Sequence, residues 1–158
     1  MRHTISILVE NHFGVLARVS GLFSARGFNI ESLAVGQTED ETISRMTIIV
    51  SGDEGILEQV MKQLNKLIDV IKVLEIGKAS VKRDLVLVKV KSKKDTRSEL
   101  MQMVDIFRAK IVDIAADSMI IELTGSEDKV VAFLELLKPF GIKEVARTGI
   151  IALSRGNW

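Results

Sequence analysis

The sequence predicts an α+β protein made of two tandem units, each with helices packed on one face of an antiparallel sheet. Two observations lead to this fold class. Stretches of alternating hydrophobicity switch repeatedly to stretches with the 3.6-residue period of a helix. The order strand–helix–strand–strand–helix–strand then occurs twice, on either side of a short break at residues 77–80. We therefore expect domains at residues 1–78 and 79–158.

The first unit begins with a strand over residues 4–10, in which Ile5, Ile7 and Val9 share one face. From Gly14 the pattern becomes helical, and Gly27 is expected to cap the end of that helix. The remaining elements are strands at residues 29–37, 44–51 and 70–76, and a second helix that follows the N-cap Asp53.

The second unit repeats this order, although the two halves share little residue identity. Its expected elements are a strand at 84–90, a helix marked by Leu100, Met103, Val104 and Phe107, a hairpin over 110–124, a helix capped by Ser126 and stopped by Pro139, and a last strand at 142–153 bent at Gly149. Each half is small and buries a modest fraction of its surface. Docking against the other half or a second chain would help both, so we expect a homodimer.

Composition excludes several classes of function. The 22 basic and 21 acidic residues give a net charge of +1, which provides no electrostatic case for binding nucleic acid or a membrane surface. The absence of cysteine excludes disulfides and thiolate metal sites. No apolar run approaches the length of a membrane span, and the chain starts without a secretory signal pattern, so we expect a cytoplasmic protein.

Nothing in the chain has the pattern of a catalytic or metal site. His3 and His12 are the only histidines, and neither has a nearby acidic cluster. No activated serine is evident beside them. Gly52 and Gly55 lack the Lys-Ser/Thr partner of a phosphate loop. We therefore expect neither catalytic nor metal-binding residues in this chain.

The junction between the first strand and the first helix has the pattern of an anion site. Asn11 and Gly14 stand where the backbone is open to a ligand, and the following helix presents unpaired N–H groups and the positive end of its dipole. Asn29 is a second short polar group at a sheet edge. The structural alternative for these residues is an Asx turn, a glycine that allows close packing, and a turn residue before a strand.

Together these groups suit a zwitterion with an apolar side chain. The helix N-terminus would bind the carboxylate, while amide oxygens and backbone carbonyls would bind the ammonium. Leu16, Ile30 and Val35 would contact the alkyl group.

Three segments carry a resemblance to a known family. The first is residues 10–33, which read Glu-Asn-x-x-Gly-Val-Leu-x-Arg-Val-x-Gly-Leu-Phe-x-x-Arg-Gly-x-Asn-Ile-x-Ser-Leu; the others are residues 44–47 and 147–156. The start of the chain resembles an ACT domain, and the whole chain resembles the small regulatory subunits of acetolactate synthase (acetohydroxyacid synthase). The resemblance implies two ferredoxin-like βαββαβ domains, of which the first is the ACT domain.

The resemblance also implies a function that composition and spacing do not give. Members of the family are not catalysts. They bind a separate catalytic large subunit, which carries thiamine diphosphate, magnesium and FAD, and they raise its activity. They also make it sensitive to feedback inhibition by valine or related branched-chain amino acids, in the biosynthesis of valine, leucine and isoleucine. We expect no cofactor in this chain itself.

In the family, two ACT domains pair side by side, and the effector lies at the dimer interface. Carried over by position, the effector site comprises Asn11, Gly14, Val15 and Leu16 of one chain, with Asn29 and Ile30 of its partner. The second domain has Ser-Lys-Lys-Asp-Thr at residues 92–96 in place of the Asn-x-x-Gly loop, so we expect no second amino-acid site.

Two other interpretations remain open from the sequence. One is a stand-alone ACT-type sensor that regulates a different enzyme or a transcription factor; no DNA-binding element supports the transcriptional version. The other is a ferredoxin-like enzyme or RNA binder, which would need a catalytic dyad or aromatic residues on the sheet face, where this chain has aliphatic residues.

Overall fold

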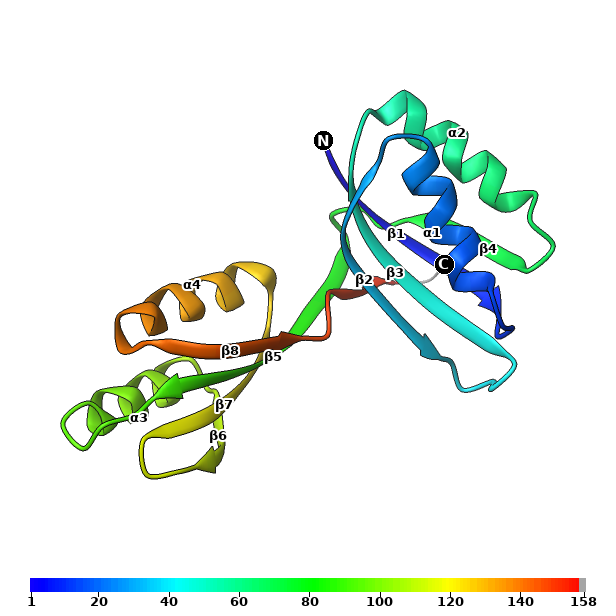
Figure 1. Ribbon diagram of the computed structural model, residues 1–158. Coiled ribbons are helices and arrows are strands. Elements are labelled where there is room, and N and C mark those ends of the chain that lie inside the picture. The colour runs from blue at the N-terminus through cyan, green and yellow to red at the C-terminus, as the bar shows by residue number, and fades with distance from the viewer. Residues whose placement is uncertain (157–158) are drawn as a thin grey trace. The chain divides into compact units, whose positions relative to one another are not determined.

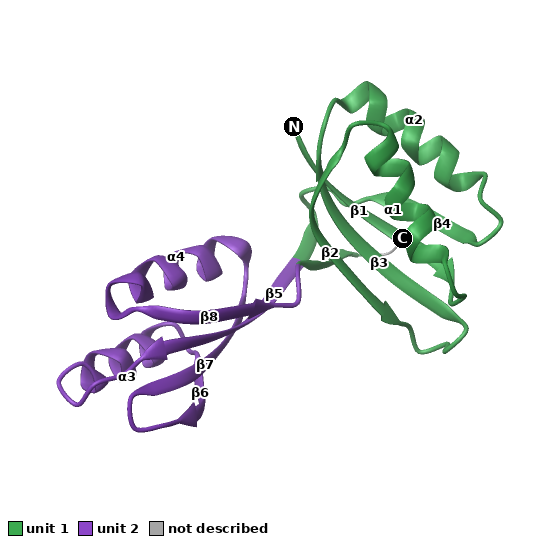
Figure 2. Ribbon diagram, viewed as in Figure 1, with its two compact units in different colours: residues 1–81, 150–158 green, residues 82–149 purple. Residues whose placement is uncertain are grey.

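The computed structural model describes residues 1–156 and divides the chain into two compact units (Figure 1). Unit 1 comprises residues 1–81 together with the C-terminal segment from Ile150, and unit 2 comprises residues 82–149 (Figure 2). Each unit has the predicted antiparallel sheet with its helices on one face, so the predicted α+β fold class is confirmed.

Unit 1 has a four-stranded sheet of order β2-β3-β1-β4. Its elements are β1 (Arg2–Glu10), α1 (Val15–Ala25), β2 (Asn29–Gln37), β3 (Ile43–Ser51), α2 (Glu54–Asn65) and β4 (Val70–Glu75). All three strand pairs are antiparallel, and β2 forms one edge of the sheet.

The core of unit 1 follows from the two periodicities in the sequence. Ile5, Ile7 and Val9 alternate along β1 and are buried beneath the helices, where Val19 and Phe23 of α1 are fully buried as well. The other face of the sheet carries small polar side chains that include Thr4, Ser6 and Thr47, all of them buried. This part of the second face is therefore covered as well.

The helix ends of unit 1 match the predicted caps. The side chain of Asp53 accepts a hydrogen bond of 2.7 Å from the backbone N–H of Gly55, which makes Asp53 the N-cap of α2. Gly27 follows the last turn of α1 with φ +81°, a conformation that a residue with a side chain rarely adopts. This left-handed turn reverses the chain from α1 into β2.

Unit 2 has a sheet of order β6-β7-β5-β8. Its elements are β5 (Ser80–Lys91), α3 (Arg97–Ile106), β6 (Lys110–Ile114), β7 (Ser118–Gly125), α4 (Glu127–Leu137), the 3-10 turn η1 (Lys138–Phe140) and β8 (Ile142–Arg147). Val86, Val88 and Val90 alternate into a core that includes Phe133 of α4. Ser126 caps α4 by accepting from the N–H of Lys129, as predicted.

The C-terminal part of the chain differs from two predictions. One was a single bent strand at 142–153, and the other was a second domain that continues to residue 158. The chain leaves β8 at Arg147, turns at Gly149 with φ +83°, and forms a separate strand, β9 (Ile151–Ser154). From Ile150 it belongs to unit 1, where the N–H of Ile150 donates to the hydroxyl of Ser32 at 3.1 Å. The predicted change of direction at Gly149 is thus present, but it separates two strands rather than bending a single one. The predicted domain's last two residues lie outside the described part of the chain.

Candidate functional site

The loop between β1 and α1 is held by backbone and side-chain hydrogen bonds. The N–H of Asn11 donates to the carbonyl of Thr42 at 2.7 Å, and its side-chain Nδ2 donates to the carbonyl of Glu41 at 3.0 Å. Both acceptors lie in the loop between β2 and β3. The Asn11 amide is therefore fixed in orientation, and its Oδ1 remains as an acceptor.

Gly14 is the N-cap residue of α1 and has φ +86°. Because this cap has no side chain, no side-chain oxygen accepts from the first N–H groups of the helix. A Cβ built on Gly14 would meet no atom within 4 Å, so the space in front of the helix is open in the single chain. The positive end of the helix dipole faces this space, and the arrangement suits a carboxylate.

The predicted apolar contacts divide into a buried part and an exposed part. Val15 is 3% exposed and packs in the core, so it positions the start of α1 rather than offering a surface. Leu16 and Val35 are 44% and 47% exposed, a large fraction for aliphatic side chains. Ile30 is partly buried and packs against the core of unit 1. Leu16 and Val35 are the apolar groups left for a ligand or a second chain.

The two halves of the predicted site lie at opposite ends of the sheet within one chain. Asn11 follows β1 at Glu10, which pairs with Ile43, whereas Asn29 pairs with Ser51 and, through it, with Arg2 at the start of β1. The eight residue steps from Arg2 to Glu10 span about 26 Å. One amino acid cannot contact both asparagines of the same chain.

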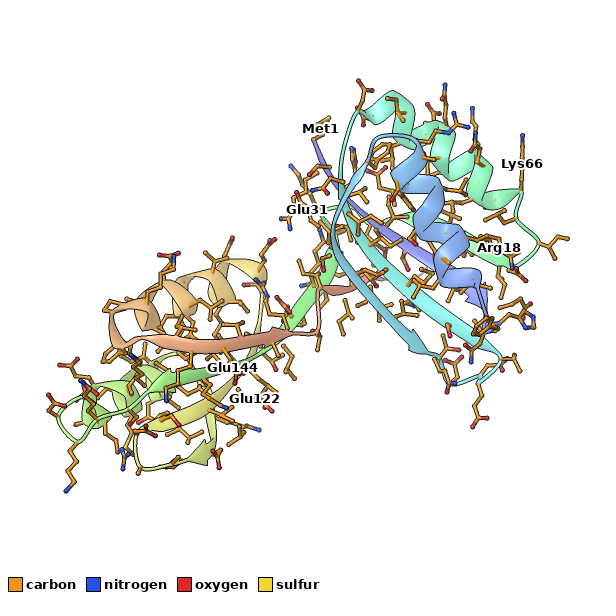
Figure 3. The ribbon with its side chains drawn as sticks, viewed as in Figure 1. Met1, Arg18, Glu31, Lys66, Glu122 and Glu144 are labelled. Carbon is orange, nitrogen blue, oxygen red and sulfur yellow. The ribbon has the colours of Figure 1, made fainter. Side chains whose placement is uncertain are left out.

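Figure 3 shows the same separation in its labelled side chains. Glu31 lies beside Met1 at one end of unit 1, and Arg18 lies at the other end. Arg18 is on the first turn of α1, where its guanidinium forms an ion pair of 2.8 Å with Asp69. The cation nearest to Gly14 along α1 is therefore already paired with a carboxylate of its own chain.

Asn29 and Ile30 are followed by a β-bulge at Glu31, which sequence reasoning did not identify. The strand register shifts between Ile30 and Ser32, and the Glu31 carboxylate accepts from Arg2 at 2.6 Å and from the hydroxyl of Ser51 at 2.5 Å. These hydrogen bonds hold the pKa of Glu31 below its ordinary value, the bond from Ser51 being the larger cause. The bulge is fixed by one link to the neighbouring strand β3 and one to β1, the strand beyond it.

Phe13 is a second residue that sequence reasoning missed. Its side chain is fully exposed at the tip of the β1–α1 loop, directly before Gly14. The signal in the sequence was an aromatic residue outside every apolar stripe. A fully exposed phenylalanine at the open end of a helix is placed to cover a ligand or to contact a partner.

Neither metal ligation nor a membrane span is found in the described part of the chain. Residues 1–156 contain no group of three or more His, Asp or Glu side chains that could hold a metal ion. None of the helices in this range has the length and apolar character needed to cross a membrane. His12 is exposed beside Asn11, and its backbone N–H bonds to the carbonyl of Glu10.

Two family models match the chain, one on each half. The model described as "AHAS small subunit-like ACT domain" matches residues 5–72. The model described as "Small subunit of acetolactate synthase" matches residues 83–156. Between them they include the β1–α1 loop, the bulge in β2 and all of β5 to β9 except the first residues of β5.

Individual relatives resemble the chain along its whole length. It is 59% identical over 157 residues to the probable acetolactate synthase small subunit of Archaeoglobus fulgidus, with 99% of each chain covered. It is 54% identical over 155 residues to the acetolactate synthase small subunit of Mycolicibacterium smegmatis, covering 98% of this chain and 91% of that one. Its fold matches the crystal structure of the acetolactate synthase small subunit from Thermotoga maritima, with a TM-score of 0.92, 43% identity, and 100% and 99% of the two chains covered.

Proposed function

The chain belongs to the family of acetolactate synthase small subunits, and from this premise we propose that it regulates a catalytic acetolactate synthase subunit. It binds that subunit, raises its activity and makes it sensitive to feedback inhibition by a branched-chain amino acid, with valine as the first candidate. The chain itself carries out no chemistry. The catalytic subunit supplies thiamine diphosphate, magnesium and FAD.

The chemistry of the β1–α1 loop supports an amino-acid effector. The uncapped start of α1 offers N–H groups to a carboxylate, since Gly14 provides no side chain to occupy them. Asn11 offers its Oδ1 to an ammonium, because its Nδ2 is bonded to Glu41. The exposed side chain of Leu16 is available for the alkyl group.

The observation that carries the proposal is the distance between the two halves of the site. Asn11 and Asn29 are at opposite ends of the sheet, yet both belong to the predicted effector site. A two-fold axis beside the edge strand β2 would bring the Asn11 end of one chain to the Asn29 end of the other. Such a homodimer would have two equivalent effector sites, each built from both chains.

The edge of the sheet is suited to such a pairing. Within the sheet that the structure describes, strand β2 pairs only with β3, so the outer backbone groups of this nine-residue strand are open. An open edge of this length pairs readily with another strand. Val35 is 47% exposed on it and would be covered by a second chain.

In this arrangement the effector changes the free energy of the dimer interface. If one interface geometry activates the catalytic subunit and another does not, an effector that binds them unequally shifts the population between them. The coupling is reciprocal, so the catalytic subunit changes the affinity for valine by the same factor as valine changes the affinity for the catalytic subunit. One methylene is worth about 1–3 kcal/mol in an apolar pocket, so leucine and isoleucine are expected to compete.

Calorimetric titration of the purified chain with L-valine, beside L-leucine and L-alanine, tests the effector site. We expect saturable binding of one valine per site and much weaker binding of alanine. The same titration is repeated with the catalytic subunit present. Absence of binding in both titrations would contradict the effector site.

Reconstitution of acetolactate formation tests the partner separately. We expect the chain to raise the activity of the catalytic subunit and valine to lower it again. Valine binding without any effect on the catalytic subunit would instead indicate a stand-alone ACT-type sensor that serves another enzyme.

A further inference from the structure

A pocket of about 350 Å³ lies in unit 1, on the face of the sheet opposite to the helices. Its floor is formed by residues of β1, β3 and β4, and its wall by Leu153, Ser154 and Gly156 of the C-terminal segment. Every residue that lines it belongs to unit 1. The pocket exists because the chain returns to unit 1 after Gly149, and it is separate from the β1–α1 loop.

Two cations lie in one row across the pocket floor. Leu8 of β1 pairs with Arg45 on one side and with Lys72 on the other, so the three residues share a face of the sheet. Adjacent strands are about 4.8 Å apart, which puts the backbones of Arg45 and Lys72 about 10 Å from each other. Two long side chains at this spacing reach a common point above Leu8.

In the part of the chain that the structure describes, no acidic side chain balances these cations. The guanidinium of Arg45 donates to the hydroxyl of Ser6 at 2.6 Å, which orients it within the pocket. Within residues 1–156, neither Arg45 nor Lys72 forms an ion pair, and no Asp or Glu lines the pocket. Two unbalanced cations attract an anion, and the planar guanidinium matches the geometry of a carboxylate.

The rest of the lining is mostly aliphatic. Leu8, Leu74, Ile76 and Leu153 contribute four apolar side chains, while Ser6 and Ser154 contribute hydroxyls. A volume of about 350 Å³ is near the lower end of the range for small-molecule sites, which usually combine an apolar lining with a few polar groups. The pocket therefore favours a small anion that carries a short alkyl chain.

We propose that this pocket binds a small aliphatic carboxylate that has no ammonium group, such as a branched 2-oxo acid. The carboxylate lies between Arg45 and Lys72, and the alkyl chain lies against Leu74 and Leu153. An amino acid is disfavoured, because its ammonium would be placed beside two cations with no carboxylate to receive it. This selectivity is opposite to that of the proposed effector site. The inference goes beyond the proposed function and stands without it.

The test uses the full chain and 3-methyl-2-oxobutanoate, the 2-oxo acid with the carbon skeleton of valine. Titration is followed by calorimetry and by NMR shifts of Leu8, Lys72 and Leu153. We expect saturable binding with shifts at these residues, and binding at least about tenfold weaker for isobutyramide, which has no charge. L-valine should not displace the oxo acid. Absence of saturable binding would overturn the proposal.

Two variants with the same loss of charge identify the site. Lys72→Gln should weaken binding of the oxo acid by about tenfold or more, because a charge-assisted hydrogen bond is lost. Lys62→Gln, an exposed position on α2 at the other face of the sheet, should leave it unchanged. Equal binding in all three chains would overturn the proposal.

Two further outcomes would also contradict it. Loss of oxo-acid binding in Gly14→Asp, with no loss in Lys72→Gln, would place the ligand at the β1–α1 loop. If no small carboxylate binds but Lys72→Gln weakens the complex with the catalytic subunit, the two cations contact an acidic protein surface instead.

A third variant tests the role of the guanidinium. Arg45→Lys, which keeps the charge but removes the guanidinium fork, should give an affinity for the oxo acid between those of the wild type and Lys72→Gln.

Discussion

The guanidinium of Arg147, at the end of β8, forms an ion pair with the carboxylate of Asp84 in β5. The side chain of Asp84 is only 1% exposed. Nε of Arg147 donates to Oδ2 of Asp84 at 3.0 Å, Nη2 donates to the same oxygen, and the hydroxyl of Thr148 reaches Oδ1 at 3.4 Å. A carboxylate removed from water remains charged only where a cation and donors replace its hydration. The pair therefore fixes the end of β8, at the point where the chain leaves unit 2.

Removing the cation from this pair should destabilise unit 2. Arg147→Met leaves Asp84 buried without its cation, and we expect a loss of about 3 kcal/mol, at the low end of the range for breaking a buried pair because Arg147 itself is 38% exposed. Lys143→Met, in the same strand, is the control, since its partner Asp117 is 81% exposed. Urea unfolding measures both variants. Equal, small losses would show that the Asp84 carboxylate does not need Arg147.

The charge at residue 14 should decide effector binding. Gly14→Asp places a carboxylate where the effector carboxylate is proposed to bind, and we expect valine affinity to fall by about tenfold or more. Gly14→Asn is the matched control: it has the same size without the charge, and Asn tolerates the φ of +86° better than most residues. Calorimetry should rank the affinities as wild type, then Gly14→Asn, then Gly14→Asp. Equal affinities for the two variants would show that backbone strain, not charge, is the cause.

Mixed dimers should reveal whether each effector site is built from two chains. Gly14→Asp and Asn29→Ala alone should each lose valine binding. In a dimer of one Gly14→Asp chain and one Asn29→Ala chain, one site receives both changes and the other receives neither. Mixing the variants, with subunit exchange, should therefore restore binding at one of the two sites in each mixed dimer. No recovery after verified exchange would contradict a site shared between chains.

Two adjacent isoleucines should differ sharply in their effect on stability. Ile150 is 5% exposed and Ile151 is 57% exposed. Ile150→Ala should cost about 2–4 kcal/mol, because it removes buried apolar volume and leaves a cavity. Ile151→Ala should change stability by less than about 1 kcal/mol. Hydrogen exchange should show that Ile150→Ala weakens protection in β1 and β3 of unit 1. Weakening confined to unit 2 would contradict the assignment of Ile150 to unit 1.

The links of Glu31 should make part of the stability of unit 1 depend on pH. The folded chain holds the pKa of Glu31 below its ordinary value, through hydrogen bonds from Ser51 and Arg2. A depressed pKa contributes stability that is fully present above the unfolded value and is lost as pH falls through the folded value. Glu31→Gln should therefore be less stable than wild type at neutral pH, and the difference should disappear in acid. Glu39→Gln, in the exposed β2–β3 loop, is the control and should not show this pH-dependent difference. If Glu31→Gln remained less stable than wild type in acid, the ionisation of Glu31 would not be the cause of the difference.

Much of unit 1 follows from local patterns. Ile5, Ile7 and Val9 mark a strand and Val19 and Phe23 mark a helix, because alternation and the 3.6-residue period each place apolar side chains on a single face. The helix N-caps Asp53 and Ser126 could also be predicted from the sequence, because their side chains accept hydrogen bonds from N–H groups that have no partner within the helix.

Features that depend on contacts between distant segments could not be predicted in this way. Thr148 and Gly149 mark a break in the last strand, but nothing local shows that the chain beyond them joins unit 1. Arg45 and Lys72 are isolated cations in the sequence, and only the pairing of both with Leu8 brings them into one row. The positions of Asn11 and Gly14 were predicted from local signals, whereas their distance from Asn29 depends on the order of strands in the sheet.

The return of the chain at Ile150 has a consequence for the order of events during synthesis. Residues 82–149 leave the ribosome as one uninterrupted unit, whereas unit 1 consists of residues translated before them and residues translated after them. Domains generally fold from the N-terminus onward as they emerge. In this chain the unit that starts first must finish last. Until then Ser32 lacks its hydrogen bond from Ile150, and Ser6 lacks Leu153 and Ser154, with which it lines a pocket in the folded unit. A nascent chain that stops short of residue 150 should therefore contain a mature second unit and an unfinished first one.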